Sequence, residues 1–198
     1  KKGYFFVFCL AGLGNRFKEA GVIKPKYLLE YKYNQSLILE EIISAFNFDK
    51  AAKIKFFCNE RDKSYKASML SLLSKFELDY EIKYINDTRG QAETAYLACK
   101  YIKENYSESS STWPIVFFNG DTILKCRNLK KLLNMLDDEI FGLIDCFNSD
   151  KNNYSYVNVD KNNIIKDIRE KVVISNFATS GLYIFLNPRI YIDYYKKA

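Results

Sequence analysis

The feature that most constrains the fold is an apolar run near the start of the chain that ends in a glycine-rich segment. Residues 4–10 are Tyr-Phe-Phe-Val-Phe-Cys-Leu, and they lead directly into Ala-Gly-Leu-Gly-Asn-Arg at residues 11–16. A continuous apolar run of this length, rich in aromatic residues, is typical of a buried strand. Glycine lacks a Cβ and adopts positive φ readily, so the backbone can turn sharply after the run. The segment therefore predicts a first core strand followed by a tight turn.

Apolar periodicity predicts alternating helices and strands along the rest of the chain. Helical faces are expected over residues 35–46, 62–76, 91–106 and 128–136, and short strands over residues 54–58, 80–85, 115–118 and 140–146. Residues 157–165 predict a small hairpin, and the serine-rich residues 107–112 predict a surface loop. Strands separated by helices of about 10–15 residues are typical of βαβ units. We expect an α/β chain, a three-layer α/β/α Rossmann-like domain with a mostly parallel mixed sheet.

Length and composition agree with a single domain over residues 1–198. The chain is 48% hydrophobic and contains 16 Tyr and 15 Phe, which suits a large packed core. The net charge of +6 suits an anionic ligand, but lysines and acids alternate along most segments and form no basic-aromatic stripe. We therefore expect no nucleic-acid partner. No stretch approaches the ~18 apolar residues of a membrane span, so no membrane partner is expected.

The absence of histidine and the scatter of the cysteines exclude several kinds of site. Without histidine, His-based triads, the common zinc sites and imidazole acid–base chemistry are not available. Five cysteines without any C-x-x-C spacing predict free thiols in a reducing compartment, and hence a cytoplasmic location. Lys1 and Lys2 before the apolar run could mimic a secretory signal. We interpret the run as a core strand, because it is aromatic and the glycine segment falls where cleavage would occur.

The residues after the first predicted strand suit a polyphosphate. Gly12 and Gly14 allow backbone N–H groups to approach phosphate oxygens closely, and Arg16 offers a fork of charged donors. Lys26 adds a second cation for another phosphate. The segment is neither of the two familiar glycine motifs, because it has no Gly-Lys pair and Phe17 stands where a dinucleotide fingerprint needs its third glycine.

This order of residues resembles the signature of the nucleotidyltransferases that activate sugar phosphates and small alcohol phosphates. That signature has Leu-Ala-Gly-Gly-x-Gly-x-Arg and then Lys-Pro-Lys, and the chain has Leu-Ala-Gly-Leu-Gly-Asn-Arg at residues 10–16 and Lys-Pro-Lys at residues 24–26. The resemblance covers essentially the whole chain in order and implies a glycosyltransferase-A-like fold. It implies that the nucleotide is bound by Leu10, Ala11, Gly12, Gly14 and Asn15. It also implies that Arg16 holds the β- and γ-phosphates, while Lys26 stabilises the charge that develops on the α-phosphate.

A second part of the resemblance follows the apolar run at residues 115–118. Asn119, Gly120 and Asp121 stand there, and ligands of parallel sheets bind beyond the carboxyl ends of the strands. A carboxylate at that point suits Mg²⁺, which favours one or two carboxylates plus substrate phosphates. In the family, the aspartate of a Gly-Asp pair holds the catalytic metal. The resemblance thus implies Asp121 as the Mg²⁺ ligand and a catalytic residue together with Arg16 and Lys26, with Asn119 and Gly120 beside the nucleotide.

The residues at the start of the predicted helix 91–106 form a weaker match. Gly90 and Gln91 resemble the family's base-and-ribose segment, and the first N–H groups of a helix are free to meet ligand oxygens. The resemblance implies that both residues bind the nucleotide. An ordinary N-capped amphipathic helix explains the same residues equally well, so both interpretations stay open.

Two late segments resemble the family's acceptor site. Glu170 and Lys171 match a Glu-Lys pair whose lysine meets the acceptor phosphate and whose glutamate binds acceptor hydroxyl groups. Ser180 and Gly181, within Ser-Gly-Leu-Tyr, match the acceptor floor, where glycine allows close approach of the backbone to a ligand. A Glu-Lys pair is also common on any charged surface.

The chain departs from the family in one respect. The family usually supplies a second metal-binding aspartate farther beyond the Glu-Lys pair than this sequence extends, and Asp193 lies in the wrong context. Three hypotheses stay open: the chain is truncated at its C-terminus, the acid comes from elsewhere, or the protein is inactive alone. A homo-oligomer is also compatible with the sequence.

We therefore expect a Mg²⁺-dependent nucleotidyltransferase that couples a nucleoside triphosphate to a sugar phosphate or small alcohol phosphate and releases pyrophosphate. The attacking group is already an anion, so no general base is needed, which agrees with the absence of histidine. Leu13 and the Gly-Gln-Ala segment resemble the capsule- and surface-sugar branch and favour CTP or UTP, in a bacterial cytoplasm. Two alternatives remain: a glycosyltransferase of similar fold, although Asn119 breaks its Asp-x-Asp motif, and a non-catalytic nucleotide-binding domain.

Overall fold

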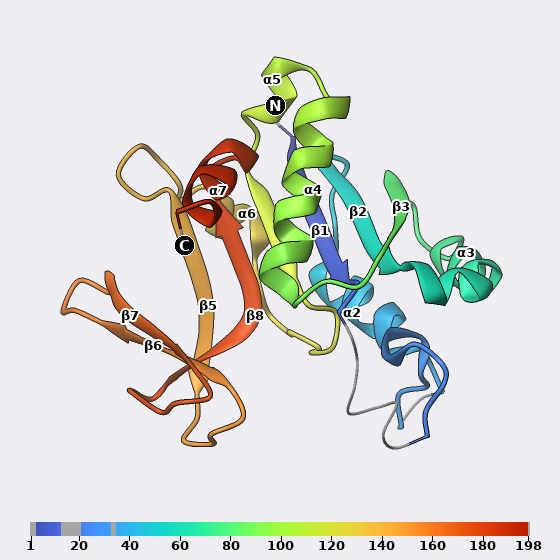
Figure 1. Cartoon of the computed structure of the whole chain (residues 1–198), viewed down its shortest axis with the longest axis horizontal. Coiled ribbons are helices and arrows are strands. Elements are labelled where there is room, and N and C mark those ends of the chain that lie inside the picture. The colour runs from blue at the N-terminus through green and yellow to red at the C-terminus, as the bar shows by residue number, and fades with distance from the viewer. Residues whose placement is uncertain (1–2, 13–20, 33–34, 198) are drawn as a thin grey trace.

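A mixed β-sheet with helices on both faces forms the centre of the protein (Figure 1). The computed structural model describes residues 3–12, 21–32 and 35–197. The strands are β1 (Tyr4–Leu10), β2 (Ala52–Asn59), β3 (Tyr80–Ile85), β4 (Ile115–Phe118), β5 (Gly142–Asn148), β6 (Ser155–Val159), β7 (Ile165–Glu170) and β8 (Phe177–Phe185). Their order in the sheet is β3-β2-β1-β4-β8-β6-β7, and β5 pairs with β8 outside this path.

The sheet has a parallel core and an antiparallel extension. Strand β1 pairs in parallel with β2 and β4, and β2 pairs in parallel with β3. Strand β8 runs antiparallel to β4, β5 and β6, and β7 pairs antiparallel with β6. The β6–β7 hairpin projects away from the helical layers at the lower left of Figure 1. The α/β prediction with a mixed sheet is confirmed.

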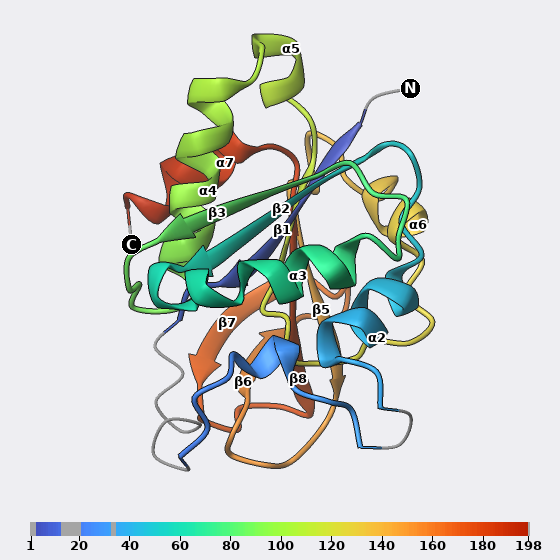
Figure 2. The same cartoon turned by 90° about the vertical axis from the view of Figure 1, so that its right-hand side faces the viewer.

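Helices cover both faces of the parallel core (Figure 2). One layer contains α2 (Ile38–Phe46), α3 (Lys66–Leu73) and α6 (Leu129–Leu133), and the other contains α4 (Gln91–Asn105) and α7 (Pro188–Tyr195). Three short elements join them: the 3₁₀ turns η1 (Lys26–Leu28) and η2 (Glu60–Tyr65), and the helix α5 (Glu108–Ser111). The arrangement is a three-layer α/β/α fold.

Strand β1 supplies the centre of both core layers. Every residue of the strand is buried, and successive side chains point to opposite faces of the sheet. Phe6 and Phe8 pack with the α2 layer, whereas Phe5 and Val7 pack with the α4 layer. The ring centroid of Phe6 lies 4.9 Å from those of Phe8 and Phe46 and 4.8 Å from that of Phe48. The apolar run at residues 4–10 is therefore buried on both faces because helices cover both.

Two of the predicted helices begin later than the periodicity indicates. The helix predicted over residues 35–46 starts at Ile38, because Leu37 still forms an antiparallel bridge with Glu30. The helix predicted over residues 62–76 is α3 preceded by the 3₁₀ turn η2. That turn begins directly at the end of β2, where the Asn59 side chain accepts a hydrogen bond from the backbone N–H of Arg61.

Two further predictions need correction. The surface loop predicted over residues 107–112 contains the short helix α5, whose first turn is capped by the Ser107 hydroxyl. The helix predicted over residues 128–136 ends at Leu133, and Asp137 then closes a turn by accepting from the N–H groups of Glu139 and Ile140. Local side-chain hydrogen bonds, which hydrophobic periodicity does not report, decide these boundaries.

Several predicted elements are confirmed with little change. The strands predicted over residues 80–85 and 115–118 coincide with β3 and β4, and the predicted hairpin is β6–β7. Its turn is held by Asp160, whose side chain accepts from the N–H groups of Asn162 and Ile164. The five cysteines are free thiols. Among the described residues, no helix has both the length and the apolar character needed to span a bilayer.

The aromatic core makes a stability prediction. We expect Phe6→Ala to lower the free energy of unfolding by about 3–5 kcal/mol, because it removes a fully buried ring and leaves a cavity. Phe177→Ala is the matched control, because this ring lies in β8 but is 41% exposed, and its loss should cost about 0.5 kcal/mol. Urea unfolding followed by circular dichroism measures both. Equal losses in the two variants would contradict the central position of Phe6 in the core.

Candidate active site

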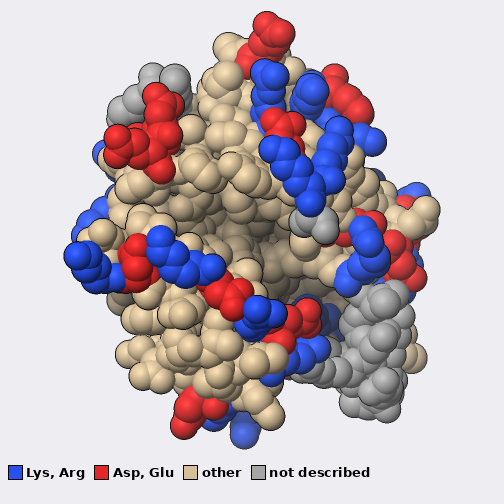
Figure 3. Space-filling model, turned by 60° about the vertical axis from the view of Figure 1, so that its left-hand side comes forward, with Lys and Arg blue, Asp and Glu red and all other residues tan. Residues whose placement is uncertain are grey.

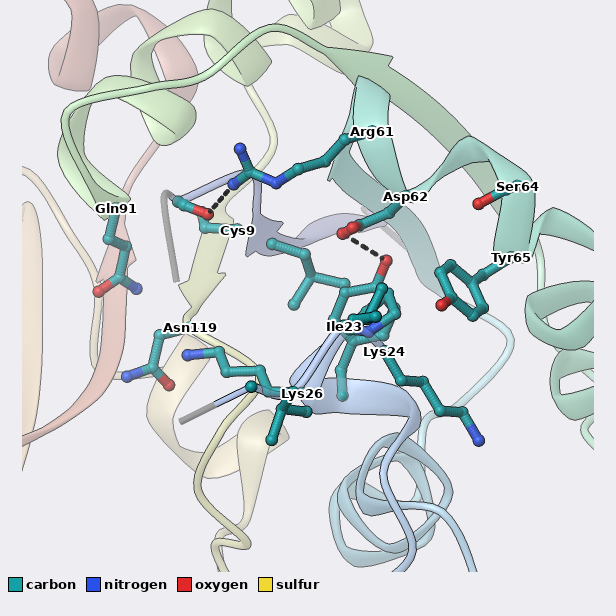
Figure 4. A pocket seen from close by; sticks show the side chains of 16 residues that line it. Cys9, Ile23, Lys24, Lys26, Arg61, Asp62, Ser64, Tyr65, Gln91 and Asn119 are labelled. Atoms are coloured by element: carbon teal, nitrogen blue, oxygen red, sulfur yellow. Dashed lines mark hydrogen bonds between the residues drawn. The ribbon is translucent and has the colours of Figure 1, made fainter. Parts of the chain in front are cut away.

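A pocket of about 670 Å³ lies where the carboxyl ends of β1, β2 and β4 meet. It is lined by the end of β1, by residues 21–27, by η2, by Gln91 at the start of α4 and by Asn119 after β4. Figure 4 shows Gln91, Asn119 and Lys26 along one side of the pocket, with Arg61 and Asp62 across from them. This is the position at which open α/β sheets bind ligands, because loops from several strand ends converge there.

The Lys26 ammonium and the Asp121 carboxylate form an ion pair at this pocket. Their Nζ and Oδ2 atoms are 2.7 Å apart, and the two side chains are 31% and 39% exposed. Lys26 begins η1, while Asp121 follows β4 after Asn119 and Gly120. Gly120 has φ of +69°, and a Cβ there would lie 2.4 Å from the Leu10 Cδ2 atom, so a glycine lets this loop pack on β1. The structure thus brings together two residues that the sequence placed in separate motifs.

Three residues from separate segments meet beside this ion pair. The Gln91 side-chain amide donates to the Gly181 carbonyl at 2.8 Å, which ties the start of α4 to β8. A Cβ at Gly181 would lie 2.4 Å from Asn119 Nδ2, and Gly181 has φ of +85°. The Asn119 Oδ1 atom is buried and has no hydrogen-bond partner among the described residues. A buried acceptor of this kind takes its hydrogen bond or its cation from outside the described residues, from water, an ion or a ligand.

Tyr27 joins the 21–27 segment to η2. Its hydroxyl donates to Asp62 Oδ2 at 3.2 Å, and its ring is almost fully buried. Burial raises the pKa of Tyr27 well above its ordinary value, and the neighbouring Cys58 and Asp62 raise it further. The hydroxyl therefore stays protonated at neutral pH and acts as a fixed donor that holds this wall of the pocket.

The expected phosphate-binding segment is described in part. Leu10 and Ala11 are buried, and Gly12 is exposed and forms a parallel bridge with Thr88. Gly14, Asn15 and Arg16 lie outside the described residues. Because Ala11 is fully buried directly after β1, its side chain presents no surface to a ligand.

The expected acceptor residues fall into two separate places. Ser180 and Gly181 are buried in β8, where Gly181 contacts both Gln91 and Asn119 at the pocket. Glu170 and Lys171 lie at the end of β7, where their side chains are 77% and 56% exposed and pair with each other at 3.2 Å. Neither residue lines the pocket. The structure therefore places the Ser-Gly segment against Gln91 and Asn119 and leaves the Glu-Lys pair on the hairpin.

The surface around this part of the molecule carries both signs of charge. Figure 3 shows one face hollowed at its centre, with basic and acidic side chains alternating along its border. An anionic ligand that enters such a hollow meets individual cations and no continuous basic field. This agrees with a site that selects a phosphorylated ligand by placed groups.

The residues present are compatible with a magnesium ion. In the part of the chain that the structure describes, no three His, Cys, Asp or Glu side chains gather. The Asp121 carboxylate and the unpartnered Asn119 oxygen are hard oxygen donors at one strand end. Magnesium is usually held by one or two carboxylates together with substrate phosphates, so a single carboxylate fits this mode of binding.

The sequence-based predictions do not include three polar residues in and beside the pocket. Arg61 lines the pocket, and Asn59 and Asp87 are its hydrogen-bonded neighbours. Asn59 ends β2, Arg61 follows it, and Asp87 follows β3, so each stands at or beyond the carboxyl end of a parallel strand. The rule that points to Asp121, that ligand groups follow the strands of a parallel sheet, also identifies these three. Their hydrogen bonds to one another and to the end of β1 could not be predicted, because they depend on the order of the strands in the sheet.

The fold and the pocket define an α/β protein whose ligand site is assembled at the strand ends around a lysine–aspartate pair. The family model described as "Nucleotidyl transferase" matches residues 10–197. The chain therefore belongs to the nucleotidyl transferase family, and the resemblance noted in the sequence is confirmed.

Solved structures share the fold. A nucleoside-diphosphate-sugar pyrophosphorylase from Vibrio cholerae RC9 is 22% identical, with a TM-score of 0.75 over 97% of this chain and 77% of that chain. HddC from Yersinia pseudotuberculosis is also 22% identical, with a TM-score of 0.70 over 97% of this chain and 80% of that chain. A UDP-glucose pyrophosphorylase complexed with UDP-glucose is 15% identical, with a TM-score of 0.70 over 100% and 80%. No curated protein matches the chain significantly.

Gly181 supplies a test of the site geometry. We expect Gly181→Ala to lower the free energy of unfolding by about 2 kcal/mol or more, because the new methyl group meets Asn119 and the backbone has positive φ. Gly142→Ala is the matched control in β5. Its Cβ would meet the Phe185 ring at 3.6 Å, an ordinary contact. Urea unfolding compares the two variants, and a Gly181→Ala protein as stable as Gly142→Ala would contradict the close approach.

Proposed function

We propose that the protein is a nucleotidyltransferase that couples a nucleoside triphosphate to a phosphorylated sugar or small alcohol and releases pyrophosphate. The observation that carries the proposal is the Lys26–Asp121 pair at 2.7 Å, which joins two motifs 95 residues apart at the pocket. One cation and one carboxylate at the strand ends suit the binding of a metal–triphosphate complex. Membership of the nucleotidyl transferase family supports the same reaction class.

In the proposed reaction an oxygen of the acceptor phosphate attacks the α-phosphorus of the triphosphate. The bond from the α-phosphorus to the β-phosphate oxygen breaks, and pyrophosphate leaves with the electron pair. The attacking phosphate is already an anion, so no residue has to remove a proton, and the chain has no histidine to do so. Catalysis then depends on positioning and on neutralising charge. Lys26 stabilises the negative charge that accumulates on the α-phosphate.

The other residues act by binding and orienting the substrates. Asp121 together with Asn119 would hold a magnesium ion, which would supply positive charge to the triphosphate. Gly12, Gly14 and Arg16 hold the β- and γ-phosphates. The nucleotide is also contacted by Leu10, Ala11, Asn15, Gly90, Gln91 and Gly120.

We place the acceptor beside β8. Ser180 and Gly181 form its floor, and this position is supported by the Gln91–Gly181 hydrogen bond, which links the two substrate regions. Glu170 and Lys171 on the β6–β7 hairpin contact the acceptor hydroxyl groups and phosphate, respectively. The neighbouring structures named as nucleotide-sugar pyrophosphorylases support a sugar phosphate as acceptor.

The biological role is proposed from the resemblance. CTP or UTP is the nucleotide, the product is a precursor of a bacterial capsule or surface polysaccharide, and the enzyme works in the cytoplasm as a homo-oligomer. The free cysteines agree with a reducing compartment.

Pyrophosphate release tests the reaction. The protein is incubated with Mg²⁺, one of CTP, UTP, dTTP, GTP or ATP, and a panel of sugar 1-phosphates and alcohol phosphates. We expect release with one pair of substrates and on the order of 10²-fold or greater loss in Asp121→Ala, because the metal loses its carboxylate. Asp79→Ala is the matched control, since Asp79 is also an exposed partner of a lysine, Lys53, but lies away from the pocket.

The two alternative functions give different results in the same assay. Hydrolysis of a nucleotide sugar without pyrophosphate release would support the glycosyltransferase. Tight nucleotide binding without turnover of any acceptor would support a non-catalytic domain. Full activity in Asp121→Ala would contradict the role given to the Lys26–Asp121 pair.

The ion pair also predicts opposite effects of one substitution. We expect Lys26→Met to reduce turnover on the order of 10²–10³-fold, because charge on the α-phosphate is no longer stabilised. The same change should tighten Mn²⁺ binding in the absence of nucleotide by about fivefold, because Lys26 no longer competes for Asp121. Electron paramagnetic resonance of Mn²⁺ measures this directly. Lys53→Met is the control, and unchanged or weaker Mn²⁺ binding in Lys26→Met would contradict the shared use of Asp121.

A further inference from the structure

Arg61 connects the end of β1 to the segment after β3. One guanidinium nitrogen donates to the Gly12 carbonyl at 3.1 Å, the dashed line at Arg61 in Figure 4. The other donates to Asp87 Oδ1 at 2.6 Å. Gly12 stands at the start of the expected phosphate-binding turn. Asp87 directly precedes the Thr88–Gln91 segment at the start of α4. A single guanidinium therefore spans the two segments that are proposed to bind the nucleotide.

Asn59 extends the same network beneath Arg61. Its buried side-chain amide donates to the Ala11 carbonyl at 3.1 Å and to Asp87 Oδ1 at 2.7 Å. Its oxygen accepts from the backbone N–H of Arg61 at 3.1 Å, so it also fixes the residue that carries the guanidinium. Two successive carbonyl groups, those of Ala11 and Gly12, are thus held by side chains from the end of β2.

Holding these carbonyls has a consequence for an anionic ligand. A carbonyl oxygen that faces a phosphate repels it, whereas a peptide whose carbonyl is held elsewhere can present the opposite, N–H side to the ligand. Because glycine restricts the backbone little, Gly12 does not fix this orientation by itself. A planar two-point donor such as arginine does fix it, and Asp87 keeps the guanidinium in place.

We infer that Arg61 and Asp87 form a positioning pair that orients the backbone at Gly12 for binding of the triphosphate. The inference rests on the proposed function and deepens it, since it assigns to the pocket two residues that belong to neither sequence motif. Arg61 acts through the backbone and not as a phosphate ligand. Asp87 is required because it orients Arg61, although it is itself an anion in a site for anions.

A direct phosphate contact by Arg61 would behave differently. If the guanidinium bound phosphate, Asp87 would compete for it, and Asp87→Ala would leave triphosphate affinity equal or higher. If the guanidinium positions the backbone, losing either partner weakens the same step. The sign of the Asp87→Ala effect therefore separates a positioning pair from a phosphate ligand.

The test measures triphosphate binding by calorimetry without acceptor, together with steady-state constants, for Arg61→Lys, Asp87→Ala and the double variant. We expect each single change to raise Kd and KM for the triphosphate on the order of tenfold, with kcat and the KM of the acceptor within about twofold. Lysine cannot replace the fork, so Arg61→Lys should not restore binding. The double variant should lose little more than either single variant, because both act through one contact.

Two further measurements complete the design. Lys63→Ala is the matched control, because Lys63 also lies in η2 and pairs with a carboxylate, Glu60, at 2.7 Å on the exposed surface. Hydrogen exchange of the fragment that spans residues 11–13 should be faster in Arg61→Lys and unchanged in Lys63→Ala, because the Gly12 carbonyl and the N–H that follows it belong to one planar peptide group. This readout needs no nucleotide, so it tests the pair even if the proposed function is wrong.

The outcomes are distinguishable. A wild-type protein that binds no triphosphate would contradict the proposed function, and hydrogen exchange alone would then decide whether the pair orients Gly12. Wild-type binding with unchanged or tighter binding in Asp87→Ala would overturn the inference. The inference would also be overturned if kcat fell and the KM of the acceptor rose as much as the KM of the triphosphate, together with a lower free energy of unfolding in urea. The pair would then support the fold alone.

Discussion

The structure depends on the burial of β1 between two helical layers. Every residue of this strand is buried, its two edges pair with β2 and β4, and its alternate side chains anchor the α2 layer and the α4 layer. Burial of apolar area is the dominant favourable contribution to folding, so this strand contributes a large part of the stabilising free energy. The same packing places the carboxyl end of β1 at the centre of the site, between the ends of its neighbours.

The strands of this sheet hold the residues of the site in place. Asn59 ends β2, Asn119 follows β4, and Gly181 lies within β8, so each polar group or close backbone contact is fixed by a strand of the sheet. Glycine is needed at Gly120 and Gly181, because φ is positive at both and a Cβ at either would lie only 2.4 Å from a side-chain atom of a neighbouring segment. Functional groups held by strands and tight turns are positioned more accurately than groups on long loops.

The chemistry available at this site is electrostatic. The pocket offers lysine, arginine and carboxylate groups and no imidazole, and the nearby Tyr27 is held as a neutral donor by burial. Such a set is suited to binding and orienting phosphates and to neutralising charge, and it includes no imidazole, the side chain that ordinarily exchanges protons near neutral pH. A reaction between two phosphates needs no such group. The composition of the pocket and membership of the nucleotidyl transferase family therefore agree.

Local sequence patterns determined the elements and the motifs of this protein. The apolar run at residues 4–10, the strand at 115–118 and the hairpin at 157–165 were predictable because burial and periodicity are local properties. Lys26 and Asp121 were identified as separate candidate site residues from the motifs around them. Their contact at 2.7 Å, the packing of Gly181 on Asn119 and the network of Arg61 were decided by the tertiary structure. The physical reason is that strand order and the close approach of backbones bring distant segments together, and neither can be determined from local sequence patterns.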